Sequence, residues 1–240
     1  MGVSRRHFVA SLGLFAAGCA QGQVSQRRRP SPLWPDPVAH PEPTGTTRFI
    51  RPSTEGLPRT PWPRQAAPRL ANLPLISRHQ WAKADPIPKR LNVMGGKSRI
   101  TVHHEGWTPV WFDDDKQTAA RLDSIRRSHL KRMRAGDIGY HFVIDRGGRI
   151  WQGRDLRYQG AHVKNHNEHN IGVMVLGNFD LQRPATVQIS TLQKLLSALR
   201  ASYDVPVRRI HTHRELNPTT CPGKHLQSGV ASLRSNGHLA

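Results

Sequence analysis

The chain has 240 residues, and its 36 lysines and arginines against 16 aspartates and glutamates give a formal net charge of +20. The apolar run at 9–17 is too short to span a bilayer stably as a mature anchor. The charge is typical of nucleic-acid binders, but the basic residues are spread along the chain and no nucleic-acid motif is present. We therefore expect no nucleic-acid partner and attribute the charge to attraction toward other polyanions, with solubility as the alternative.

Residues 1–18 are predicted to be an export signal outside the fold. Arg5-Arg6 and their neighbours resemble a twin-arginine signal, and the apolar run 9–17 supplies its core. The following Ala-Ala-Gly-Cys19 is typical of a lipobox, where the signal is cut and the cysteine is lipidated; ordinary cleavage with an incidental Cys19 is the alternative. Removing the signal leaves 20 − 2 = +18 charges. We expect an exported lipoprotein of the cell envelope, anchored to a membrane through Cys19, which places it in the periplasm or outer membrane if the cell is Gram-negative.

Residues 19–73 are predicted to be a tether. Eleven of the nineteen prolines lie between Pro30 and Pro68, interleaved with Arg, Ser, Thr and Gln. Such a composition has too little apolar surface to offset the entropy of ordering, so the segment is expected to be semi-extended and polyproline-like. The arginines at 27–29, next to Cys19, favour an anionic membrane surface or wall polymer.

Residues 74–240 are long enough for one domain with its own core, and we expect a monomer. Short β-branched or apolar runs are predicted as strands over 99–103, 140–145, 149–152, 171–176 and 208–211. The second and third of these are joined by a hairpin-turn signal at 145–148.

Two helices follow from the apolar period. The first is predicted over 118–134, with Thr118 as its N-cap and Gly136 as its stop. The second is predicted over 186–203, where an apolar stripe leaves Lys194 and other charged residues in solvent. Strands interspersed with helices indicate an α/β domain with a central sheet covered by helices.

A candidate metal site begins with the stretch 211–223, which reads HTHRELNPTTCPG and holds two histidines two residues apart and Cys221. Imidazole nitrogen and thiolate sulfur are ligands that zinc takes readily. A third ligand is expected from the pair His103-His104, which follows a β-prone run. Strand alternation lets only one of this pair face a common site. Spacing alone chooses neither between these two histidines nor between the two in the later stretch.

These motifs resemble the peptidoglycan recognition protein and type 2 N-acetylmuramoyl-L-alanine amidase superfamily, which includes the phage amidase-type lysozymes. The matching segments occur in the family's order, over about residues 75–226: ISRHQW at 76–81, TVHH at 101–104, DIGYHFVI at 137–144, GAHVKNHN at 160–167, NIGV at 170–173 and HRELNPTTCPG at 213–223. The resemblance implies a single α/β domain with a central mixed β-sheet flanked by helices. It also implies zinc held by His103, His213 and Cys221, with a fourth position open to water.

The resemblance implies roles for two further site residues. Tyr140, in the DIGY segment, is expected to hold the attacking water or the developing oxyanion, with a buried core tyrosine as the alternative. Thr219 lies where amidases of the family carry a residue that donates to the tetrahedral intermediate, with a turn hydroxyl as the alternative. Glu105 departs from the family pattern, and strand parity alone suggests it as a general base.

His162 is similar to the family's substrate-groove histidine, Asn170 is expected to hydrogen-bond the peptide stem, and Trp107 to wall the groove and stack on the sugar. The chain is therefore predicted to be a zinc-dependent amidase that cleaves the lactyl–L-alanine amide of peptidoglycan or muropeptides. A non-catalytic peptidoglycan-binding module is the first alternative, and a basic nucleic-acid binder is the second. Cys221 favours catalysis, because a pure binder has no need of a thiolate there.

Overall fold

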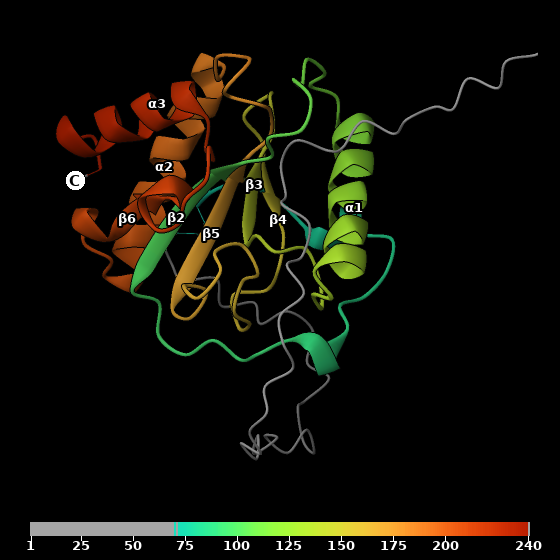
Figure 1. Cartoon of the computed structure of the whole chain (residues 1–240). Coiled ribbons are helices and arrows are strands. Elements are labelled where there is room, and N and C mark those ends of the chain that lie inside the picture. The colour runs from blue at the N-terminus through green and yellow to red at the C-terminus, as the bar shows by residue number, and fades with distance from the viewer. Residues whose placement is uncertain (1–69, 71, 240) are drawn as a thin grey trace, which may run out of the picture. The chain divides into compact units, whose positions relative to one another are not determined.

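A computed structural model of the chain describes residues 70 and 72–239 (Figure 1). The predicted signal sequence, Cys19 and most of the predicted tether lie outside the described residues. Within the described part, no helix combines the length and the apolar character needed to cross a bilayer.

The domain is built on one six-stranded sheet with strand order β1-β4-β3-β5-β2-β6. The strands are β1 (Leu75–Ile76), β2 (Arg99–His104), β3 (Phe142–Ile144), β4 (Ile150–Gln152), β5 (Asn170–Val175) and β6 (Ile210–Thr212). Strand β2, next to the edge strand β6, runs parallel to β5 and to β6, whereas β3 and β4 form an antiparallel hairpin. The predicted mixed central sheet is confirmed.

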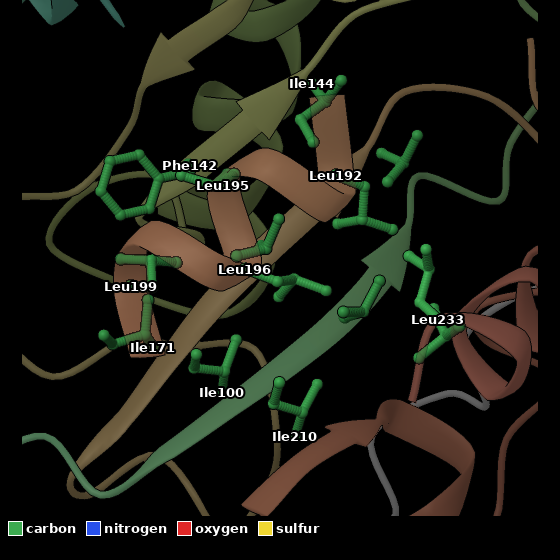
Figure 2. Packing of buried hydrophobic residues seen from close by; sticks show 14 of the residues in the cluster. Ile100, Phe142, Ile144, Ile171, Leu192, Leu195, Leu196, Leu199, Ile210 and Leu233 are labelled. Carbon is green, nitrogen blue, oxygen red and sulfur yellow. The ribbon is translucent and has the colours of Figure 1, made fainter. Parts of the chain in front are cut away.

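Helices cover both faces of the sheet, with α2 and α3 on one side and α1 on the other (Figure 1). The α-helices are α1 (Asp115–Arg132), α2 (Thr186–Tyr203) and α3 (Lys224–Ser235), and the 3-10 helices are η1 (Arg78–Gln80), η2 (Pro88–Arg90), η3 (Val207–Arg209) and η4 (His213–Glu215). The larger core lies under α2 and α3, where leucines of α2 meet isoleucines of the sheet (Figure 2).

Alternation along β2 divides its side chains between the two layers. Ile100 and Val102 lie in the core beneath α2, so His103 faces the opposite layer, beneath α1. On β5, Val173 belongs to the α2 layer and Met174 to the α1 layer, in register with Val102 and His103. The α1 face therefore carries the first of the predicted zinc ligands.

The predicted helix over 186–203 is confirmed with those bounds as α2, and Asp204 ends it in the left-handed conformation with φ 52°. The first helix was predicted wrongly at its start. Its N-cap is Asp114, whose carboxylate accepts a hydrogen bond of 2.8 Å from the backbone N–H of Gln117, and Thr118 is buried inside the helix. A carboxylate caps the free N–H groups of a first turn as well as a hydroxyl does and also favours the helix dipole.

The packed domain begins earlier than residue 74, where the sequence placed the end of the tether. Leu70 is 2% exposed in the larger core, and Leu73 packs against the same core. Leu70 therefore serves the fold, because full burial of a leucine side chain stabilises a domain by about 1.5 to 3 kcal/mol. Leu73 contributes less, because it is only partly buried.

Candidate metal centre

Three side chains from distant segments meet at the carboxyl end of β2. They are His103 in β2, His213 at the start of η4, and Cys221 in the loop before α3. One ligand atom of each lies within 4.8 Å of the others. Sγ of Cys221 is 3.6 Å from Nδ1 of His103, and the His103 and His213 rings are 4.7 Å apart. The structure thus brings together the three residues that the sequence proposed as metal ligands.

The neighbouring histidines lie elsewhere. His104 points to the other face of the sheet, where its Nδ1 accepts a hydrogen bond of 3.2 Å from the backbone N–H of Phe179. His211 lies in β6 with its Nδ1 3.9 Å from a carboxylate oxygen of Glu215. His211 and His213 do not share a strand, because β6 ends at Thr212 and His213 already belongs to η4.

The protonation states of this cluster suit a divalent cation. Burial lowers the pKa of His103 well below its ordinary value and that of His213 to about 4, so both rings are neutral at pH 7. Burial raises the pKa of the Cys221 thiol to about 12. Two neutral imidazoles with a thiol beside them form a set that lacks a positive charge, and zinc supplies that charge while favouring the thiolate.

Tyr140 lies beside the cluster, with its ring 5.1 Å from that of His103. Burial raises the pKa of its hydroxyl, and the nearby Cys221 and Glu105 raise it further, so the hydroxyl keeps its proton at neutral pH and can donate it in a hydrogen bond. Its segment is held from behind by a buried ion pair of 2.9 Å between Arg78 and Asp137.

Glu105 is buried next to the site and pairs with Arg121 of α1 at 2.6 Å. Burial raises the pKa of its carboxyl to about 7, and the charge of Arg121 offsets part of that rise. The Arg121 guanidinium also lies 5.0 Å above the ring of Trp107, which is half-buried. Glu105 lies one residue beyond the end of β2, where its charge raises the pKa of Tyr140 and its carboxylate contacts the Arg121 guanidinium.

Thr219 is exposed in the loop that carries Cys221. Its hydroxyl oxygen accepts a hydrogen bond of 3.2 Å from the backbone N–H of Cys221. The hydroxyl thus makes the turn contact that the sequence offered as the alternative, while its own proton is free to donate to a ligand.

Two residues predicted to bind substrate are placed differently. Asn170 is fully buried, where its Oδ1 accepts from the Thr101 hydroxyl at 2.9 Å and its Nδ2 donates to the carbonyl of His166 at 2.7 Å. Both polar atoms of its side chain are thus engaged inside the domain. His162 is only 5% exposed and lies behind His103 instead of lining a groove. The burial of both side chains depends on contacts between distant segments, which the sequence alone does not reveal.

His129 is a residue near the site that the sequence treated only as part of a helix stripe. Its Nδ1 accepts a hydrogen bond of 2.8 Å from the backbone N–H of Gly139, and its ring lies 5.6 Å from that of Tyr140. A histidine among the leucine and isoleucine of an inward helix face is the signal that marks it.

Glu215 ties the segment of His213 to helix α3. Its carboxylate accepts hydrogen bonds from the backbone N–H of Thr212 at 2.9 Å, from Arg234 at 2.7 and 2.8 Å, and from Gln227 at 3.0 Å. Burial alone would raise the pKa of Glu215, but these hydrogen bonds outweigh it and lower the pKa to about 2.

Glu215→Gln is expected to reduce the free energy of unfolding at pH 7 by about 1 to 2 kcal/mol, because the pair with Arg234 is partly exposed. The folded pKa of about 2 lies below the unfolded value of about 4.3. The wild type therefore has this stabilisation in full at pH values above the unfolded pKa of about 4.3, and loses it as the pH falls toward the folded pKa of about 2. Urea unfolding at pH 7, 4 and 2.5 measures both effects; the same pH dependence in the variant would contradict the assignment.

Comparison with known proteins identifies relatives of this domain. Residues 95–224 match the family model described as N-acetylmuramoyl-L-alanine amidase. A human protein of that name is 33% identical over 129 residues, which cover 53% of this chain and 22% of the human protein. A peptidoglycan-recognition protein of Drosophila simulans is 28% identical over 153 residues, which cover 63% of this chain and 82% of the fly protein.

Solved structures share the fold. Drosophila PGRP-LB superposes with a TM-score of 0.60 at 24% identity, covering 69% of this chain and 95% of that one. The amidase LysC of Clostridium intestinale gives 0.54 at 22% identity, covering 66% and 96%. PGRP-LE, solved in complex with tracheal cytotoxin, a monomeric diaminopimelic acid-type peptidoglycan, gives 0.60 at 20% identity, covering 66% and 93%. At these identities the structures establish a common fold.

Proposed function

Because the chain belongs to the N-acetylmuramoyl-L-alanine amidase family, we propose that it is a zinc-dependent amidase. Its substrate is the amide bond between the lactyl group of N-acetylmuramic acid and the L-alanine of the peptide stem, in peptidoglycan or muropeptides. The observation that carries this proposal is the cluster of His103, His213 and Cys221 beside the buried Tyr140.

The residues fit the metal that the reaction needs. Two imidazole nitrogens and one sulfur are a donor set typical of zinc, and three protein ligands leave a tetrahedral ion one open position. A bound zinc ion supplies Lewis-acid chemistry, polarising the amide carbonyl and making water a nucleophile at neutral pH.

Protein groups around the cluster supply the remaining steps. Tyr140 keeps its hydroxyl proton and donates it in a hydrogen bond to the negative charge that develops on the carbonyl oxygen. Thr219, in the loop that carries Cys221, donates a second hydrogen bond to the same carbonyl oxygen. Glu105 accepts the proton of the attacking water and returns it to the departing nitrogen of L-alanine, because a pKa of about 7 suits both transfers at neutral pH.

Glu105→Gln is expected to lower kcat/KM at pH 7.5 by about tenfold. This loss is smaller than is usual on removal of a general base, because Arg121 already pairs with the carboxylate. The base acts in its ionised form, so wild-type kcat/KM rises with pH through about 7, and the variant lacks this rise. Rate profiles between pH 5 and 9 check the expectation. Arg121→Gln is the matched control, since it keeps the carboxylate and raises its pKa; an unchanged profile in both variants would remove Glu105 from the mechanism.

The test of the function is release of free stem peptide from purified sacculi. The zinc-loaded protein is expected to release the peptide, a chelator to stop the release, and added zinc to restore it. A non-catalytic module, the competing function, binds sacculi with the same affinity with or without metal and releases nothing.

We propose that the protein acts in the cell envelope as a lipoprotein held by Cys19, with the proline-rich segment as the tether. The motif around Cys19 and the preceding apolar run support this proposal. The protein is expected to partition into the detergent phase of solubilised membranes, and Cys19→Ala to move it to the aqueous phase. A wild type that stays in the aqueous phase would contradict the lipid anchor.

A further inference from the structure

A second buried imidazole lies directly behind His103 and takes no part in the proposed reaction. Nδ1 of His162 is 3.0 Å from Nε2 of His103, and Nε2 of His162 is 3.3 Å from the carbonyl oxygen of Asn170. The rings of His103 and His162 meet edge to face, with centroids 4.9 Å apart. Two hydrogen bonds thus connect the main chain of β5 to the metal-facing ring.

The donor and acceptor roles in these two hydrogen bonds follow from the carbonyl group of Asn170. A carbonyl oxygen only accepts, so a neutral His162 must carry its proton on Nε2 and donate it to Asn170. Nδ1 of His162 then holds a lone pair and accepts from Nε2 of His103. His103 in turn has no proton on Nδ1, the atom that lies 3.6 Å from Sγ of Cys221. The lone pair of His103 therefore faces the other two ligands.

The backbone is shaped to hold the His162 ring in this place. A Cβ atom added at Gly172 would lie 2.6 Å from Cδ2 of His162, and one added at Gly160 would lie 2.2 Å from the same atom. Only residues without a side chain leave room for the ring at these two points. The backbone N–H of His162 is also fixed, since it donates to Oδ1 of Asn167 at 2.9 Å.

We propose that His162 is a positioning residue that fixes the proton of His103 on Nε2 and so presents Nδ1 of His103 to zinc. The inference rests on the proposed metal site and goes beyond it, because it assigns His162 to the ligand and not to the substrate. Partners of this kind orient metal-binding histidines and make them better ligands.

His141 provides a matched control. It is also a buried histidine, with its ring 6.0 Å from that of His162. Its hydrogen bonds go to the main chain alone, from the N–H of Gly172 at 2.9 Å and with the carbonyl of Tyr158 at 3.0 Å. Loss of this ring disturbs the same region of the fold without removing the partner of His103.

The first measurement is the tautomer of His103 in the metal-free full chain, by NMR of ¹⁵N-labelled histidine, with its signal assigned through His103→Gln. We expect the Nε2–H form in the wild type and a mixture of both forms in His162→Leu. A wild type with the proton on Nδ1 of His103 would overturn the proposal, whether or not any variant folds.

The second measurement is zinc affinity by competition with a chelator. We expect His162→Leu to weaken zinc binding by about 10- to 100-fold, His162→Asn to recover most of it through an acceptor oxygen near the position of Nδ1, and His141→Leu to stay within about threefold of the wild type. Equal affinity in His162→Leu and the wild type, or equal losses in His162→Leu and His141→Leu, would overturn the positioning role. A wild type that binds no zinc would instead overturn the proposed function itself.

Discussion

Cys221→Ser is expected to abolish the release of stem peptide from sacculi, with a loss of at least about 10³-fold, because the catalytic contribution of the metal is worth several kcal/mol. A serine hydroxyl stays protonated at neutral pH and is a poor zinc ligand, so His103 and His213 alone must hold the ion. Initial rates with and without added zinc measure the loss.

The variant is expected to remain folded. The loop is anchored by two hydrogen bonds of the Cys221 main chain that serine keeps. The N–H of Arg214 donates to the carbonyl of Cys221 at 2.9 Å, and the N–H of Cys221 donates to the side-chain hydroxyl of Thr219 at 3.2 Å. A thermal unfolding curve of the metal-free proteins tests this. Nearly full activity in Cys221→Ser would contradict the metal site.

Histidines of the same motif provide the control. His213→Gln is expected to lose activity as Cys221→Ser does, whereas His211→Gln is expected to stay within about twofold of the wild type, because His211 faces Glu215 rather than the cluster. Equal losses of activity at His211 and His213 would mean that this segment tolerates no substitution. The loss in Cys221→Ser would then no longer be evidence for a metal site.

Tyr140→Phe is expected to lower kcat by about 10² to 10³-fold, the usual effect of removing one donor to an oxyanion. KM and zinc affinity are expected to stay nearly unchanged, since the hydroxyl acts on charge that appears only in the transition state. The phenylalanine ring still fills the same place among Leu122, Ile138 and the other buried residues of this layer.

Tyr203→Phe, at the end of α2, is the matched control and is expected to leave kcat unchanged. Steady-state kinetics on a defined muropeptide, together with zinc titration of each variant, separate the possibilities. A Tyr140→Phe protein that loses zinc with its activity would make the tyrosine a structural support of the ligands, and one with wild-type kcat would remove it from the reaction.

In the described part of the chain, the predicted runs match α1, α2 and the strands β2 to β6 to within three residues at each end, whereas α3 and β1 were missed. The bounds of α2 follow from an apolar stripe that keeps the helical period from Ile189 to Tyr203. Helix α3 was missed because only Leu226, Val230 and Leu233 of its residues are buried, and glycine and serine interrupt the pattern. Strand β1 has two residues, too few for any period to appear.

The sequence pattern alone cannot select which histidines face the metal site. Alternation separates His103 from His104, but both faces of this sheet are covered by helices, so the neighbours Ile100 to Val102 do not reveal which face holds the site. The family resemblance made that choice, and the packing of β2 under α2 agrees with it. The place of His162 was beyond the sequence, since it depends on Gly172 of another segment lying beneath its ring.

X-ray absorption at the zinc edge of the loaded wild-type protein tests the metal centre most directly. We expect one zinc per chain, with one sulfur at about 2.3 Å, two imidazole nitrogens at about 2.0 Å and one further light atom. A spectrum of nitrogen and oxygen neighbours without sulfur would contradict it.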